Sequence, residues 1–171
     1  MKILILNGSP HKNGATSELI RAFTEGAESS GHEVKTFWLQ GMNIRGCLAC
    51  DYCKNKTAEI NPCVQKDDMH EIYEAFNECD VLVLATPVYF WTFSAQLKTA
   101  LDRLYAYVMW RLPELSRSKK TMLISTGNAD DYRDILNWYA GFEKYCGMKS
   151  LGVVTGKNNT DGAKSAGENL S

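Results

Sequence analysis

The stretch MKILILNGSPHKNGAT (residues 1–16) leads from an apolar strand through a loop of small polar residues into the start of a helix. Its unbroken apolar run, Ile3–Leu6, is typical of a parallel strand that is covered on both faces of its sheet. Gly8 and Gly14 permit tight turns on either side of the polar loop. Because free backbone amides and the helix dipole favour an anion at a helix start, the segment predicts a phosphate site.

The kind of phosphate is narrowed by the motifs that this segment lacks. A P-loop needs G-x-x-x-x-G-K-[ST], but Gly8 and Gly14 are one residue too far apart and Ala15 occupies the lysine position. The dinucleotide motif G-x-G-x-x-G is absent as well. A phosphate monoester held by hydroxyls and amides remains, with an ordinary strand-to-helix turn as the alternative interpretation.

Length and charge exclude several classes of partner. A chain of 171 residues can bury about 70% of its unfolded surface in one domain. The formal net charge of −1 leaves no basic patch for nucleic acid or for an anionic membrane. The N-terminus starts directly with a strand, and no apolar run approaches the roughly 18 residues of a membrane span. We expect a soluble cytoplasmic protein that forms one domain over residues 1–171.

Apolar strands and amphipathic helices alternate along the chain. After the first strand, the pattern predicts strands at about 33–39, 81–85, 121–125 and 151–155, and helices at about 15–30, 66–78, 94–110 and 131–146. This alternation predicts an α/β fold, a flavodoxin-like three-layer sandwich with a five-stranded parallel sheet in the order 2-1-3-4-5. The polar tail from Lys157 onward is expected to be loosely ordered.

In such a sheet, the loops after the third and fourth predicted strands lie beside the loop after the first. The first of them, Thr86–Thr92, holds a proline and three adjacent aromatic residues at an edge where bare rings are unfavourable. A flat conjugated ring would cover them, and core packing is the alternative interpretation. The other, Ser125–Asn128, has a glycine and short polar groups that allow close approach. A flat ring and a phosphate monoester together describe FMN.

Four motifs carry a family resemblance over most of residues 1–130. They are NGSPHKNGATS (7–17), CLACDYC (47–53), CVQKDDM (63–69) and ATPVYFWTFSAQLKTALDR (85–103). With them the chain resembles the flavodoxin-like NAD(P)H-dependent FMN reductase family, in the branch related to the iron-sulfur flavoproteins. The resemblance implies a phosphate site at Ser9, His11, Asn13, Ala15, Thr16 and Ser17, and an isoalloxazine site at Pro87, Val88, Tyr89 and Phe90, next to Thr126 and Gly127. His11 stands where the family often has arginine.

The implied activity is an FMN-dependent oxidoreductase in which NAD(P)H reduces the flavin and a small acceptor, such as a flavin or quinone, reoxidises it by a ping-pong mechanism. The flavin carries the chemistry, so no catalytic side chain is expected. Backbone amides of residues 88–91 and 126–128 are expected to stabilise charge on the ring. By analogy, Tyr105, Tyr107, Trp110 and Trp138 would serve the interface of a homodimer or homotetramer.

Cysteines form the second conspicuous group. Cys47, Cys50 and Cys53 have C-x2-C-x2-C spacing in a loop (47–63) inserted after the second strand, and Cys63 offers a fourth thiolate. A [4Fe–4S] cluster, a zinc ion and free thiols are the alternatives. By resemblance, the last cysteine of an iron-sulfur flavoprotein follows the third by four to seven residues, whereas nine residues intervene here. An iron-sulfur electron carrier and a thiol or flavin redox sensor therefore remain as alternative functions.

Other charged and sulfur-bearing residues have ordinary structural interpretations. Lys98, Asp102 and Arg103 are expected on the polar side of the third helix, with Lys98 and Asp102 as an i,i+4 pair. The acidic pair Asp67–Asp68 is expected to open the second helix, where carboxylates suit the helix dipole. Two further cysteines near helix ends, Cys79 and Cys146, are expected in the core.

Overall fold

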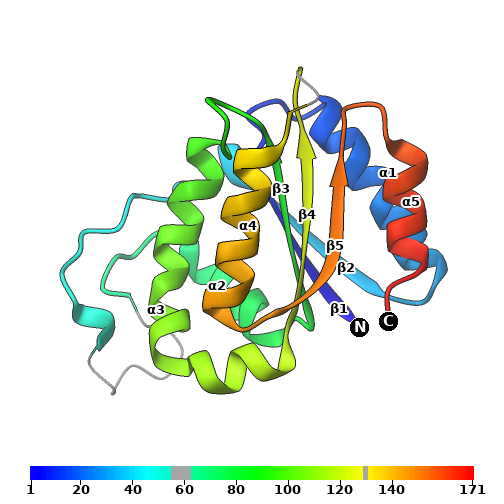
Figure 1. Ribbon diagram of the computed structural model, residues 1–171. Coiled ribbons are helices and arrows are strands. Elements are labelled where there is room, and N and C mark those ends of the chain that lie inside the picture. Colours follow the sequence, from blue (N-terminus) through cyan, green and yellow to red (C-terminus); the bar gives the residue numbers. More distant parts are fainter. Residues whose placement is uncertain (55–62, 129–130) are drawn as a thin grey trace.

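A five-stranded parallel sheet in the order β2-β1-β3-β4-β5 forms the centre of the computed structural model, which confirms the expected fold class (Figure 1). The structure describes residues 1–54, 63–128 and 131–171, without the side chains of 108–117. The strands are β1 (Lys2–Asn7), β2 (Glu33–Trp38), β3 (Val81–Pro87), β4 (Lys120–Thr126) and β5 (Lys149–Thr155). The α-helices are α1 (Ala15–Ser29), α2 (Met69–Glu78), α3 (Ala95–Ser118), α4 (Arg133–Cys146) and α5 (Thr160–Glu168), with short 3-10 turns η1 (Leu39–Gly41) and η2 (Tyr52–Lys54).

Helices cover both faces of the sheet, which explains the unbroken apolar strands. Helices α1 and α5 lie on one face, and α2, α3 and α4 lie on the other (Figure 1). Successive residues of β1 point to opposite faces, so that Ile3 and Ile5 pack under Phe23 of α1 while Leu4 and Leu6 pack under α2 and α3. All four side chains are at most 2% exposed. The strand pattern read from the sequence thus has its expected physical cause.

The strand register brings three loops to one edge of the sheet. Asn7 at the end of β1 pairs with Ala85, and Thr126 at the end of β4 pairs with Pro87 at the end of β3. Because all strands run in the same direction, the loops that follow β1, β3 and β4 leave from the same carboxyl edge. This edge is where the sequence places the candidate ligand residues.

Most of the tail from Lys157 onward forms helix α5 (Thr160–Glu168), so the expectation that it is loosely ordered is wrong. Helix α5 is capped by Asn159, whose side chain accepts a hydrogen bond from the Gly162 amide at 3.2 Å. It packs directly on α1, because Gly26 and Gly167 at the contact leave no side chain between the two backbones. Glycines indicate a close helix contact only when the partner helix is known. The contact between α1 and α5 could therefore not be predicted from the sequence.

A buried ion pair occupies the place where the sequence suggests two surface charges. Arg103 and Asp67 form a bidentate contact, with nitrogen–oxygen distances of 2.7 and 3.1 Å. Their side chains are 1% and 0% exposed. Burial would raise the pKa of Asp67, but the hydrogen bonds and charge of Arg103 outweigh it and lower that pKa. The expectations for Lys98, Asp102, Cys79 and Cys146 are confirmed, since the first two form an exposed pair and both cysteines are buried.

The contact between α1 and α5 makes a prediction about stability. A Cβ atom on Gly167 would lie 2.2 Å from the Phe23 carbonyl oxygen and 2.7 Å from the Ala27 nitrogen. We expect Gly167→Ala to force the helices apart and to lower the free energy of unfolding by about 1–3 kcal/mol. The matched control is Gly141→Ala in the middle of α4, where a Cβ meets nothing within 4 Å. That variant is expected to gain about 0.5–1 kcal/mol from helix propensity. Urea unfolding measures both, and equal effects would contradict the contact.

Candidate functional site

A cavity of about 310 Å³ opens at the carboxyl edge of the sheet, between the loops that follow β1, β3 and β4. Nine of the twelve predicted flavin-site residues line it. They are Ser9, His11, Ala15, Thr16, Pro87, Val88, Tyr89, Thr126 and Gly127. Gly14, Asn128 and Lys157 complete the lining. The structure thus brings together three segments that are far apart in the sequence.

Thr126 joins the three loops through two hydrogen bonds. Its hydroxyl lies 2.7 Å from the Thr16 hydroxyl at the start of α1, and its carbonyl oxygen accepts the Val88 amide at 2.6 Å. Both threonines are buried, at 2% and 5% exposure. The two hydroxyls carry two hydrogens, and their mutual bond uses one. One O–H group is therefore left to donate to a ligand in the cavity.

The first loop is shaped by its own side chains. The Ser9 hydroxyl accepts the His11 amide and donates to the His11 carbonyl oxygen, both at 3.2 Å. Ser17, a predicted phosphate ligand, instead donates to that carbonyl from behind and accepts from Asn7. The N-cap of α1 is Gly14, which supplies no side-chain bond to the helix amides. Helix-start amides without a side-chain cap are suited to bind an anion.

Three of the predicted residues, Asn13, Ser17 and Phe90, do not line the cavity, and Lys157, which was not predicted, does. Asn13 is exposed outside it, and Phe90 is 91% exposed on the rim of the β3 loop. Lys157 was missed because the loop after β5 carries no recognised motif. Its ammonium lies 3.4 Å from the side-chain oxygen of Asn128 and adds a positive charge to the cavity. Lys157 could have been predicted from its position two residues after β5, because the loop after this strand leaves from the same edge of the sheet.

The aromatic loop forms a tight turn with unusual backbone geometry. Tyr89 and Thr92 exchange two backbone hydrogen bonds of 2.8 and 3.1 Å around Phe90 and Trp91. These two central residues have φ angles of +48° and +66°. The form resembles a type I′ turn, which favours asparagine and glycine. Bulky residues in this conformation are strained, and the two hydrogen bonds of the turn hold these exposed rings next to Tyr89, which lines the cavity.

Two of the backbone amides expected to bind a ligand are already hydrogen-bonded within the protein. The Val88 amide is bound to Thr126, and the Tyr89 amide is bound to Thr92. Neither is free to stabilise charge on a ligand, so the expectation for residues 88–91 is wrong at these two positions. The remaining backbone donors of that expectation lie at 90–91 and 126–128.

The four loop cysteines lie around one small cavity beside α3. Cys47, Cys50, Cys53 and Cys63 line it together with Gln65 and Arg103. Burial first, and then the neighbouring thiolates of Cys47, Cys63 and Cys50, raise the pKa of Cys53. Among the described residues, no three His, Cys, Asp or Glu side chains converge on a point that could hold a single metal ion. A [4Fe–4S] cluster instead takes one thiolate at each of four separate irons.

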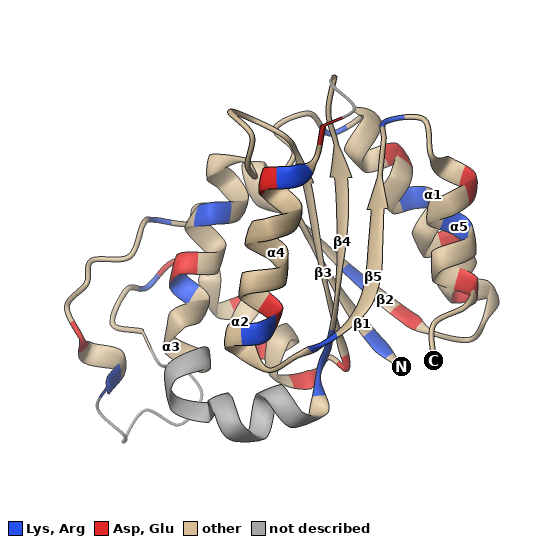
Figure 2. Cartoon of the chain, viewed as in Figure 1, with Lys and Arg blue, Asp and Glu red and all other residues tan. Residues whose placement is uncertain are grey.

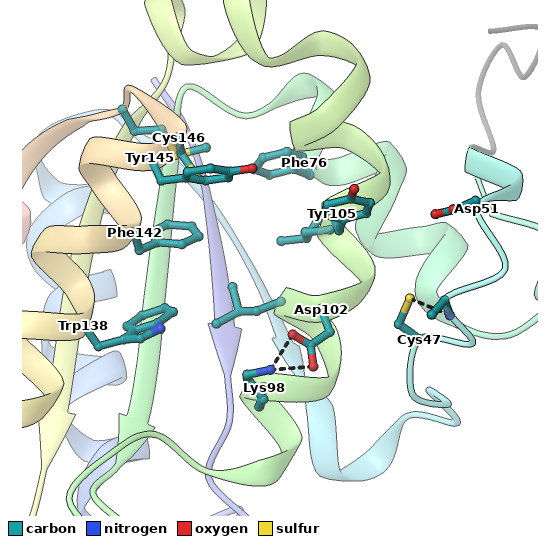
Figure 3. A pocket seen from close by; sticks show the side chains of 14 residues that line it. Cys47, Asp51, Phe76, Lys98, Asp102, Tyr105, Trp138, Phe142, Tyr145 and Cys146 are labelled. Atoms are coloured by element: carbon teal, nitrogen blue, oxygen red, sulfur yellow. Dashed lines mark hydrogen bonds and ion pairs between the residues drawn. The ribbon is translucent and has the colours of Figure 1, made fainter. Parts of the chain in front are cut away.

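An apolar groove of about 460 Å³ separates α3 from α4 (Figure 3). Trp138 and Phe142 of α4 stack at a centroid distance of 5.2 Å and face Tyr105 of α3. The exposed pair Lys98–Asp102 lies at one end, and Cys47 borders the other side.

One of the aromatic residues expected at an interface lies in the core instead. Tyr107 is buried at 4% exposure against Tyr73 and Phe76, and it therefore belongs to the core. Trp110 falls outside the described side chains.

Residues of both charges occur on most helices and strands of the described chain (Figure 2). No helix of the described chain is both long and apolar enough to cross a membrane.

Comparison with known proteins gives three consistent findings. A family model described as NADPH-dependent FMN reductase matches residues 1–134. An iron-sulfur flavoprotein of Archaeoglobus fulgidus is 37% identical over 107 residues, covering 63% of this chain and 47% of the relative. Another, of Methanocaldococcus jannaschii, is 35% identical over 127 residues, covering 74% and 62%. The chain thus spans about half to three-fifths of the length of these curated relatives.

A solved structure shares the fold over the whole chain. The NAD(P)H:quinone oxidoreductase of Methanothermobacter marburgensis superposes with a TM-score of 0.75 at 20% identity, covering 100% of this chain and 96% of the other. At 20% sequence identity, this structural similarity establishes the fold alone.

Two variants of Trp91 distinguish the effect of backbone strain from the effect of its aromatic ring. Trp91→Gly removes both the ring and the left-handed strain, whereas Trp91→Ala removes the ring alone. Because a left-handed residue with a Cβ costs about 1–2 kcal/mol, the glycine variant is expected to unfold at higher urea concentration than the alanine variant. If both variants change ligand affinity by the same amount, that change is due to loss of the Trp91 ring. Equal stability of the two variants would contradict the strain.

Proposed function

The chain belongs to the NADPH-dependent FMN reductase family, and we propose that it transfers electrons from NADH or NADPH through bound FMN to a small acceptor such as a flavin or quinone. The observation that carries the proposal is the single cavity that joins an uncapped helix start, a buried hydroxyl pair and an aromatic turn. These three features fit the two ends of FMN.

The phosphate end of FMN fits the β1–α1 loop. Amides at the start of α1 and the spare hydroxyl hydrogen of the Thr16–Thr126 pair would donate to phosphate oxygens. His11 lines the same cavity in place of the family's frequent arginine. Lys157 also lines the cavity and adds a positive charge to it. The donor set therefore suits a dianion.

The ring end fits the loops after β3 and β4. Pro87, Val88 and Tyr89 form one wall, and Gly127 allows backbone to approach the ring edge. FMN, when bound, supplies the hydride and electron chemistry. The protein's part is to hold the ring and to leave one face open beside Phe90 and Trp91. Because donor and acceptor would share that face, they would react in turn, which supports a ping-pong mechanism.

Flavin titration and steady-state turnover test this proposal together. Purified protein is expected to bind FMN more tightly than riboflavin, and the holoprotein to oxidise NADH or NADPH with flavin or quinone acceptors. Lys157→Met is expected to weaken FMN binding about tenfold and riboflavin binding less, because FMN carries a charged phosphate that riboflavin lacks. The matched control, Lys164→Met on α5, removes an exposed lysine far from the cavity lining. Absence of flavin binding and of NAD(P)H oxidation would refute the proposal.

A second candidate function is supported by the cysteine cavity. Four thiols from two separate segments line one cavity, and curated relatives are named iron-sulfur flavoproteins. We propose on this basis that Cys47, Cys50, Cys53 and Cys63 hold a [4Fe–4S] cluster that exchanges electrons with the flavin. A thiol sensor has less support, because a sensor needs a lowered thiol pKa and that of Cys53 is raised.

The apolar groove between α3 and α4 is a candidate interface between copies of the chain. The groove between α3 and α4 presents Tyr105 and Tyr145 at 36% and 61% exposure. A net charge of −1 offers little repulsion between copies. We therefore propose a second copy of the chain as the occupant of this groove, in a homodimer or homotetramer. Light scattering at increasing concentration measures the mass.

A further inference from the structure

Arg103 connects the buried side of α3 to both arms of the cysteine segment. One of its terminal nitrogens donates to the Arg45 carbonyl oxygen at 2.8 Å and to Asp67 at 2.7 Å. Asp67 in turn accepts the Arg45 amide at 3.1 Å. Arg45 precedes Cys47 by two residues, and Asp67 follows Cys63 by four. The ion pair therefore fixes the chain just before and just after the four cysteines.

Anchoring alone does not explain a buried charge at this position. A buried ion pair is often no more stabilising than apolar side chains of the same volume, because both charges lose their hydration. A neutral side chain could also accept or donate the hydrogen bonds to Arg45. We therefore expect the Arg103 guanidinium to have a role that depends on its positive charge or on its Nε–H group.

The Nε–H group of Arg103 faces no partner among the described residues. Nε of Arg103 is buried and makes no hydrogen bond there, although both terminal nitrogens are bonded. Arg103 is 2% exposed and lines the cysteine cavity. A positive charge and a free donor therefore lie beside the four thiols.

We propose that Arg103 is the residue that sets the electron affinity of the cysteine site, by placing its Nε–H group and its positive charge against a sulfur of the cluster held there. This inference rests on the second candidate function above. A cluster held there would gain one negative charge on accepting an electron from reduced flavin, and Arg103 would stabilise that charge without giving up a proton. Hydrogen bonds to sulfur and net charge are known determinants of iron-sulfur potentials.

Local backbone geometry supports a site built for a negatively charged group. Ala49 and Asp51 have φ angles of +50° and +56°. Left-handed residues in short loops turn backbone amides to one side, as in many anion and iron-sulfur sites. The Ala49 amide donates to the Cys47 sulfur at 3.4 Å. Arg103 would add the charged donor from the opposite, buried side of the cavity.

The decisive variant is Arg103→Lys, which keeps a positive charge within reach of Asp67 but lacks Nε. Wild type and variant are reconstituted anaerobically with iron and sulfide, as full-length holoprotein with FMN. Iron and sulfide per chain, the electron paramagnetic resonance signal after reduction, and the midpoint potential are measured. We expect the variant to bind FMN and iron as the wild type does. At a fixed potential, its ratio of reduced to oxidised cluster is expected to fall about tenfold, which is about 59 mV for one electron.

Two further variants serve as controls. Arg133→Lys changes an exposed arginine that is paired with Asp131 outside the cavity lining, and it is expected to leave the potential unchanged. The double variant Asp67→Leu/Arg103→Met removes both buried charges without leaving one alone, which protects the fold. Its potential is expected to fall further than that of Arg103→Lys. FMN affinity and urea unfolding check the fold of each variant.

The outcomes separate this inference from the proposals on which it rests. A wild-type protein that takes up no iron and sulfide overturns the cluster, and with it the role of Arg103, while flavin binding and turnover are judged separately. A loaded wild type whose potential equals that of Arg103→Lys and of the double variant overturns the inference alone. Lower iron content at an unchanged potential would show that Arg103 only anchors the segment.

Discussion

The contact between Ser94 and Gly8 is the constraint on which the candidate site depends. The Ser94 hydroxyl donates to the Gly8 carbonyl oxygen at 2.6 Å, and the Ser94 amide donates to the Thr86 hydroxyl at 3.0 Å. The same hydroxyl accepts the Leu97 amide at 3.3 Å, which caps α3. One serine thus ties the loop after β1, the end of β3 and the start of α3 together.

Only glycine fits at the other side of this contact. A Cβ atom on Gly8 would lie 2.7 Å from both the Leu97 Cβ and the Ser94 Oγ. The Gly8 amide extends the ladder to the Ala85 carbonyl oxygen at 2.8 Å. Because the β1–α1 loop is held this close to β3 and α3, the start of α1 comes within reach of Thr126 and the cavity closes on three sides. The glycine is required by close packing, not by a special φ angle.

The sequence predicts features that depend on local pattern and misses those that depend on a distant partner. Apolar runs such as Val81–Ala85 and the polar loop at 7–17 carry their own signal, because strand burial and helix capping act over a few residues. Arg103 has no such signal, since its burial depends on Asp67, which lies 36 positions earlier in the chain. Lys157 reaches the site only because β5 is the neighbour of β4.

Helix α3 links the two cavities. Ser94 caps its start and holds the loop after β1, which lines the cavity at the carboxyl edge, and Arg103 lies nine residues further along at the cysteine cavity. At 1.5 Å per residue, the two positions are about 13 Å apart along the helix axis. A helix of this length keeps a fixed rise per residue. The spacing of the two sites is therefore a property of α3. A change in the charge at Arg103 that leaves the helix intact can alter the cysteine site while the geometry at Ser94 and Gly8 stays the same.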